Sequence, residues 1–127
     1  MRRVIIDMKN YLFADAVRRS LISFDSDFEP YKTEKAEETT ELCKMLHPYA
    51  LIMEVTEPSP WSLTERLKIR DMVKVQEPNC KIVLMVDENT EKELADKVRK
   101  AKKDGLIDGF IYGSISTTYL TAVLDTL

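Results

Sequence analysis

Four nearly continuous apolar runs, separated by segments with helical periodicity, restrict the fold of this chain more than any other feature. They are RVIID (3–7), ALIMEV (50–55), KIVLMV (81–86) and GFIY (109–112). A continuous apolar run is typical of a strand that is covered on both faces in a parallel sheet. A fifth run, FEPYK (28–32), alternates and contains Pro30, and this pattern predicts an edge strand.

Between the runs, apolar residues recur at the spacing of a helix with one buried face. The five sets are Phe13, Val17 and Leu21; Ala36, Thr40 and Cys43; Leu63, Leu67, Ile69, Met72 and Val73; Leu94, Val98 and Ala101; and Leu120, Val123, Leu124 and Leu127. Strict alternation with right-handed crossovers predicts an α/β fold: a doubly wound five-stranded parallel sheet in the flavodoxin-like order 2-1-3-4-5, with helices on both faces.

Helix boundaries have their own sequence signals. Ser62 with Glu65, and Thr90 with Glu93, form two capping boxes, each placed just before a periodic run. Gly105 follows the fourth helical pattern, as expected of a residue that ends a helix. Both kinds of signal agree with the predicted alternation.

Length and composition describe one ordinary globular domain. The 127 residues suffice for a single core, and 44% hydrophobic with 32% charged residues excludes disorder. A net charge of −3 gives no general attraction to nucleic acid or anionic membrane, and no apolar run is long enough to span a bilayer. Cys43 and Cys80 lie in apolar segments, so we expect buried free thiols in a cytoplasmic protein rather than a disulfide.

The carboxyl ends of the strands are where a sheet of this order holds its functional site. Four segments that reach this edge resemble those of the response-regulator receiver domain, and the resemblance covers the whole chain. ALIMEVTEP is similar to the family's third strand, which ends in the phospho-accepting Asp with a Pro four residues later. KIVLMV resembles its fourth strand, DGFIYGSI its fifth strand and turn, and RVIIDMKNYLF its first strand and helix start.

The resemblance places the phosphorylation site on residues that differ from those of the family. The phospho-acceptor position falls on Glu54, and the following Pro on Pro58. The acidic pair that holds Mg²⁺ falls on Met8 and Lys9, or on Asp7 and Met8 if the register shifts by one. A Glu carries its carboxylate one methylene further out than an Asp, so ordinary phosphotransfer is not expected.

The other working positions are also replaced. The hydroxyl residue that binds the phosphoryl group falls on Asp87, or on Val86 after a similar shift, and the Lys of the fifth strand falls on Gly113, with the following Pro on Ser114. Phe110 keeps an aromatic at the switch position. Because phosphoryl transfer relies on neutralising charge, we predict a degenerate receiver in two-component signalling that is not an enzyme and needs no cofactor.

The role of Glu54 has two interpretations. It imitates a phosphorylated Asp permanently, or it is a polar strand end paired with Lys9. In either case, Lys9 is the one cation that the local sequence brings to the strand ends, so we expect it within salt-bridge reach of Glu54 or Asp87.

The alternatives to a degenerate receiver are a working receiver with unusual residues, and a small α/β enzyme or divalent-metal module using Asp7, Glu54 and Asp87. Glu57 could add an oxygen ligand for Mg²⁺, although Lys9 argues against a metal.

The expected partner surface comprises the fourth helix, the fifth strand and the fifth helix. Lys97 and Lys100 lie in its basic run KVRKAKK, and Phe110 and Tyr112 lie on the strand. Through this surface a protein partner or a second copy would bind.

We expect residues 1–127 to form one receiver-like domain, which fits the N-terminal part of a longer transcription regulator. DNA contact would then require an output domain outside this chain.

Overall fold

Five parallel strands form one sheet, and each apolar run of the sequence supplies one strand to within one residue at either end. The computed structural model describes residues 1–33, 35–113 and 117–127. The strands are β1 (Arg2–Asp7), β2 (Phe28–Lys32), β3 (Ala50–Glu54), β4 (Lys81–Val86) and β5 (Gly109–Tyr112). Their order is β2-β1-β3-β4-β5, so the predicted doubly wound fold is confirmed.

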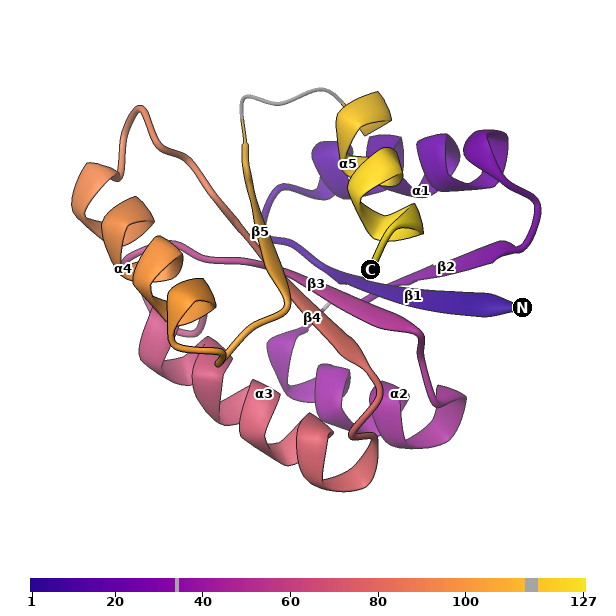
Figure 1. The fold of residues 1–127 in the computed structure, drawn as a ribbon, viewed down its shortest axis with the longest axis horizontal. Helices are drawn as coiled ribbons and strands as arrows, with labels where there is room; N and C mark the ends of the chain where they lie inside the picture. The colour runs from indigo at the N-terminus through magenta and orange to yellow at the C-terminus, as the bar shows by residue number, and fades with distance from the viewer. Residues whose placement is uncertain (34, 114–116) are drawn as a thin grey trace.

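Helices cover both faces of this sheet, as Figure 1 shows: α1 and α5 on one face, and α2, α3 and α4 on the other. Their bounds are α1 (Tyr11–Phe24), α2 (Thr39–Leu46), α3 (Leu63–Gln76), α4 (Lys92–Lys103) and α5 (Thr117–Asp125), with a short 3₁₀ helix, η1 (Ala36–Glu38), before α2. Strand side chains alternate between the two cores: Val4 and Ile6 pack under α1 and α5, and Ile5 packs on the opposite face.

Two of the five predicted helix faces need correction. On α2, the buried residues are Thr39 and Cys43, so the face is turned by one residue from the predicted Thr40. On α3, Met72 is half exposed and the core face instead includes Arg66 with Ile69 and Val73. The second of these differences places a charged side chain, Arg66, inside the protein.

The helix boundaries follow the sequence signals in two cases out of three. Ser62 caps α3 by accepting a hydrogen bond from the amide of Glu65. Gly105 has the positive φ of 78° that glycine adopts most readily after a helix. The box at Thr90 is wrong, because α4 begins one residue later and the Thr90 amide donates to the carboxylate of Asp87.

Both cysteines are buried free thiols, as predicted. Burial raises the pKa of Cys43 and of Cys80 to about 12, so both thiols are protonated and weakly nucleophilic near neutral pH. None of the helices in the described ranges combines the length and the apolarity that crossing a membrane requires.

Candidate functional site

The carboxyl ends of the strands bring together Glu54, Asp87 and Gly113, three of the positions predicted to form the site. Asp7 pairs in register with Met53, and Glu54 pairs with Met85, so the last residue of β3 extends beyond the end of β1. Glu54, Asp87 and Gly113 line one hollow of about 140 Å³, together with Glu91 and Asn10 among others.

This acidic hollow carries three carboxylates, from Glu54, Asp87 and Glu91, and no described residue lining it is a cation. A Cβ added at Gly113 would meet nothing closer than 3.9 Å, so the absence of a side chain there is not imposed by crowding. The hollow therefore repels anions, whereas a receiver attracts a phosphoryl group to this place.

Asp7 points away from the acidic hollow and into the protein, where it binds Arg66 of α3. Arg66 is fully buried. Its Nη1 donates to Asp7 Oδ2 at 2.7 Å and its Nη2 to Asp7 Oδ1 at 3.1 Å, a bidentate ion pair. Thr39 of α2 donates to the same carboxylate at 2.5 Å. In the shifted register, which places the predicted metal pair on Asp7 and Met8, the one acid of the pair is thus already neutralised by a side chain.

The guanidinium of Arg66 also fixes the backbone at the ends of two strands. Its Nε donates to the carbonyl oxygen of Glu54 at 2.8 Å, and its Nη2 donates to the carbonyl oxygen of Asp7 at 3.2 Å. A buried charge is tolerated only when its donors are used, and all three nitrogens of this guanidinium donate. Arg66 therefore joins α3 to β1 and β3 at the edge where the site lies.

Sequence reasoning missed Arg66 because a charged residue on a helix is normally assigned to the solvent side. The available signal was its spacing: Arg66, Ile69 and Val73 stand at intervals of three and four residues, so they share one face. A lone Arg on an apolar face requires a buried acid, and Asp7, which follows the apolar run of the first strand, was the available partner.

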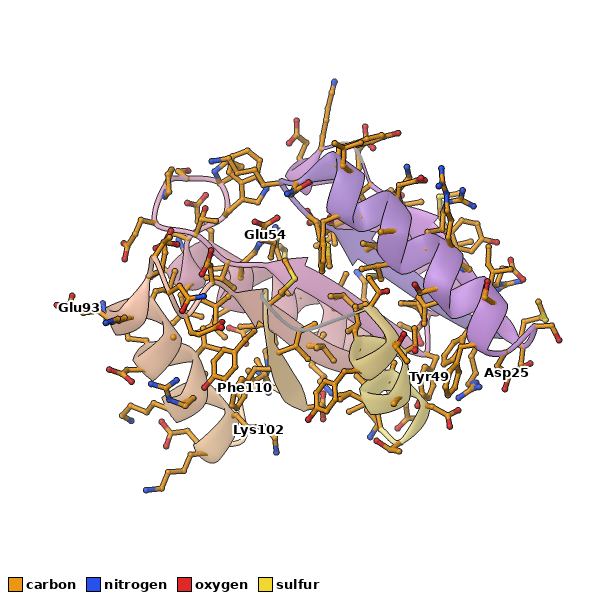
Figure 2. The ribbon with its side chains drawn as sticks, turned by 90° about the horizontal axis from the view of Figure 1, so that it is seen from above. Asp25, Tyr49, Glu54, Glu93, Lys102 and Phe110 are labelled. Carbon is orange, nitrogen blue, oxygen red and sulfur yellow. The ribbon has the colours of Figure 1, made fainter. Side chains whose placement is uncertain are left out.

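The Glu54 carboxylate is stabilised by the start of α1. Its Oε1 accepts a hydrogen bond at 3.0 Å from the amide of Asn10. Asn10 is the N-cap of α1, because its side-chain oxygen accepts from the amide of Phe13. Figure 2 shows Glu54 beside the N-terminal end of α1, with Asp25 marking the opposite end of that helix. An anion at a helix N-terminus is favoured by the helix dipole, so Glu54 needs no ammonium partner.

The predicted ion pair of Lys9 is wrong. Lys9 is exposed, and among the described residues no ion pair joins it to Glu54 or Asp87. Its Nζ lies 5.3 Å from the ring centroid of Trp61 instead. Lys9 lies two residues beyond the end of β1, and its side chain is directed to Trp61 of the loop after β3 instead of to the acidic hollow. The interpretation of Glu54 as the partner of Lys9 is therefore also wrong.

Asp87, besides lining the acidic hollow, organises the turn before α4, because its Oδ1 accepts from the amides of Asn89 and Thr90. Apart from Glu54 and Gly113, the other predicted site residues that the structure describes do not line the hollow. Glu57 is exposed, and the carbonyl of Pro58 accepts from the amide of Trp61 within the loop after β3. Ser114 lies outside the described residues. Within the described part of the chain, no three His, Cys, Asp or Glu side chains are arranged to hold a metal.

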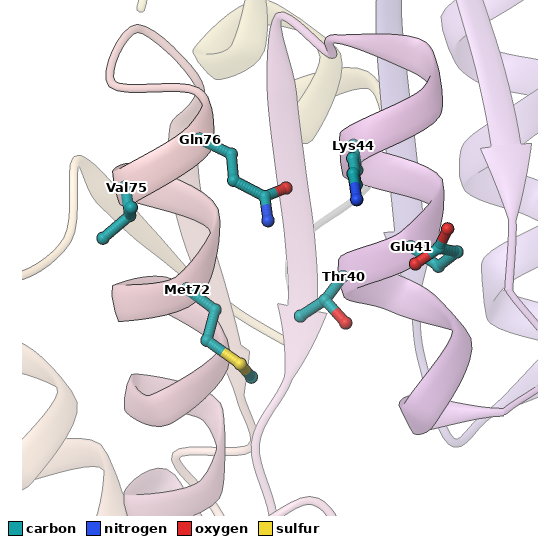
Figure 3. A pocket seen from close by; sticks show the side chains of 6 residues that line it. All are labelled: Thr40, Glu41, Lys44, Met72, Val75 and Gln76. Carbon is teal, nitrogen blue, oxygen red and sulfur yellow. The ribbon is translucent and has the colours of Figure 1, made fainter.

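A different hollow, of about 280 Å³, lies between α2 and α3 and away from the strand ends (Figure 3). Met72, Val75 and Gln76 line it from α3, and Thr40, Glu41 and Lys44 from α2. It has one acid, one base and no nucleophile beyond a hydroxyl, so it offers no catalytic arrangement.

At the predicted partner surface, Arg99 holds Tyr112. Its Nη1 donates to the Tyr112 hydroxyl at 2.7 Å, and the Phe110 ring packs edge-on against Tyr112 at 5.7 Å between centroids. Lys100 forms an ion pair with Asp104 at 2.7 Å, and Lys97 is exposed. The sequence had indicated the lysines but not the role of Arg99.

We predict that Arg66→Met lowers the free energy of unfolding by about 3–5 kcal/mol, because it leaves the Asp7 carboxylate buried without a counter-ion. Lys68→Met, two residues along on the exposed side of α3, is the matched control and should change stability by less than about 0.5 kcal/mol. Urea denaturation of the three proteins measures both effects. Equal losses in the two variants would show that the buried pair contributes nothing specific.

No protein-family model matches this chain, and no curated protein sequence matches it. Solved structures do. A DNA-binding response regulator of the LuxR family from Staphylococcus aureus is 16% identical with a TM-score of 0.73, over 99% of this chain and 98% of that one. A Thermotoga maritima response regulator in complex with Mg²⁺ and beryllofluoride is 13% identical with a TM-score of 0.73, over 99% and 98%.

A third similar structure is described as one of a "family of redox sensors in the streptococci evolved from two-component response regulators". It is 11% identical with a TM-score of 0.77, over 99% of this chain and 50% of that one. At such identities the likeness establishes the fold and leaves the activity to be argued from the site. The fold of this chain is that of the response-regulator receiver domain.

Proposed function

We propose that this chain is a degenerate receiver domain, which transmits a signal through protein contact and does not undergo aspartyl phosphorylation. The observation that carries the proposal is the state of Asp7: its carboxylate is bonded to Arg66 inside the protein, where a working receiver needs a free acid for Mg²⁺. Without that acid, the strand ends lack a ligand for the metal that would neutralise a phosphoryl group.

The charges of the acidic hollow support the same conclusion. A phosphoryl group entering it would meet Glu54, Asp87 and Glu91. Each carboxylate at about 4–6 Å would oppose the group by roughly 3–4 kcal/mol at an effective dielectric of 20. The unfavourable sum leaves little prospect of transfer, because catalysis of this step consists of positioning and charge neutralisation.

Glu54 contributes a charge that does not depend on a kinase. Its bond to the Asn10 amide ties the end of β3 to the start of α1, and Arg66 ties β3 to β1 and α3. Both links are present without any modification, so we propose that the domain has one fixed signalling state instead of two. The imitation of phospho-Asp is partial, since Glu54 bears one charge and a phosphoryl group nearly two.

The surface on α4, β5 and α5 is the proposed contact for a protein partner or a second copy. β5 is an edge strand of the sheet. Its Phe110 and Tyr112 rings pack together, and Arg99 of α4 donates to the Tyr112 hydroxyl. Lys97 is exposed at the rim and has no ion pair among the described residues. We propose a cytoplasmic setting, with residues 1–127 acting as one domain alone or joined to an output domain that contacts DNA.

Phosphorylation provides the direct test. We predict that acetyl phosphate with Mg²⁺ adds no phosphoryl group, and that beryllofluoride leaves the amide NMR spectrum unchanged, because Asp7 is bonded to Arg66 and not free to hold a metal next to Glu54. Intact-mass spectrometry and NMR measure the two results, with the Thermotoga maritima response regulator as the positive control for beryllofluoride. An adduct of one phosphoryl group that disappears in Glu54→Gln would refute the proposal.

Association tests the partner surface. For a dimer formed through α4, β5 and α5, reversing the charge in Lys97→Glu should change the association rate constant by roughly tenfold at low salt, since rim charges act mainly on encounter. Lys100→Glu should have less effect, because Lys100 already pairs with Asp104. Stopped-flow and sedimentation measurements at several salt concentrations give the values.

Lys44→Glu, an exposed lysine on α2, is the control for this charge reversal. A dimer that responds to the change at Lys44 and not to the change at Lys97 would place the interface on a different face of the protein.

A further inference from the structure

A hollow distinct from the acidic one lies at the carboxyl ends of β1 and β2, under the loop that follows β3. Its volume is about 290 Å³, and none of its lining residues lines the acidic hollow. Ligands of doubly wound sheets bind outside the carboxyl ends of the strands. The position therefore suits a ligand, and nothing in the proposed signalling role uses it.

The charge of this second hollow is opposite to that of the acidic hollow. Lys9 and Lys35 line it, both are exposed, and neither has an ion pair among the described residues. Asp7 also lines it, but Arg66 neutralises that carboxylate from beneath. Glu37 is the remaining acid on the described lining, so the two lysines outnumber the one uncompensated carboxylate. An anion is favoured here and disfavoured at the acidic hollow.

Two aromatic rings face the same space. Trp61 lines it from the loop after β3, and Tyr11 lines it from the first turn of α1. The Lys9 ammonium lies 5.3 Å from the Trp61 ring centroid, and the Lys32 ammonium lies 4.0 Å from that of Tyr11. Each ring therefore has a cation beside it. The rings can stack on a planar ring of a ligand while the neighbouring cations attract a negative group attached to it.

Thr33 adds an unused polar group. It lines the hollow with only 6% of its surface exposed, and its hydroxyl has no hydrogen-bond partner among the described residues. A buried hydroxyl without a partner carries the cost of its lost hydration, and such a group in a folded protein calls for an explanation. A ligand atom that donates to or accepts from this hydroxyl would supply one.

We propose that this hollow binds a small molecule made of a planar aromatic ring and an anionic group, either phosphate or carboxylate. Trp61 and Tyr11 stack on the ring, Lys9 and Lys35 pair with the anion, and Thr33 bonds a polar atom of the ligand. Bound there, the molecule links the β1 and β2 ends to the loop after β3. Such a ligand would give a domain without phosphorylation a chemical input. The binding proposal does not depend on how the domain signals.

The chain's single tryptophan makes the test direct, because a ¹⁵N-labelled sample has one indole N–H signal, that of Trp61. AMP serves as the ring with a phosphate and indole-3-acetate as the ring with a carboxylate. We expect at least one of them to shift this signal saturably, and the one that does identifies the anion. Adenosine, a ring without charge, and inorganic phosphate, a charge without a ring, should each bind at least about tenfold more weakly.

Matched variants separate the site from general charge effects. Lys9→Gln and Lys35→Gln should each raise the dissociation constant by about five- to tenfold, as expected for the loss of one charge-assisted contact. Lys102→Gln, at the exposed end of α4, should leave it unchanged. The proposal is overturned if neither charged ring shifts the indole signal, if inorganic phosphate binds as tightly as AMP, or if Lys9→Gln and Lys102→Gln behave alike.

Discussion

The buried ion pair between Asp7 and Arg66 determines how the functional edge of this protein is built. Taking two charges out of water is costly, and it is repaid only when geometry and hydrogen bonding are nearly complete. Here the guanidinium makes four hydrogen bonds, two to the Asp7 carboxylate and one each to the carbonyls of Asp7 and Glu54. Strands β1 and β3 and helices α2 and α3 therefore meet at one fixed point, through Thr39 as well as Arg66.

This pair divides the strand ends into two regions of opposite charge. The acidic hollow has Glu54, Asp87 and Glu91 without a counter-ion from its described lining, and the nearby Arg66 guanidinium is already committed to Asp7. On the other side, the neutralised Asp7 leaves Lys9 and Lys35 to set the charge of the second hollow. The exclusion of phosphate proposed for the first region and the anion binding proposed for the second thus both involve this one buried contact.

The sequence predicted the fold well because strands and most helix ends are coded locally. Continuous apolar runs specify β3 and β4 without reference to the rest of the chain, and the Ser62 cap depends on residues three positions apart. The site was predicted less well, because its contacts join distant segments. The partner of Asp7 is 59 residues away on α3, and Glu54 is stabilised by a backbone amide, which carries no residue-type signal.

Two local rules also failed for identifiable reasons. Lys9 was expected to pair with a nearby acid, but it lies beyond the end of β1 beside Trp61, and Glu54 is bonded to the Asn10 amide instead. Thr90 was expected to cap α4, but Asp87 binds its amide and the helix starts after Glu91.

The most direct test of the account is a double-mutant cycle on Asp7→Leu and Arg66→Met, measured by urea denaturation. The account predicts that the double variant is no less stable than either single variant, because neither charge is then left alone in the core. Losses that add within about 0.5 kcal/mol would contradict it, since they would mean that the two residues do not interact.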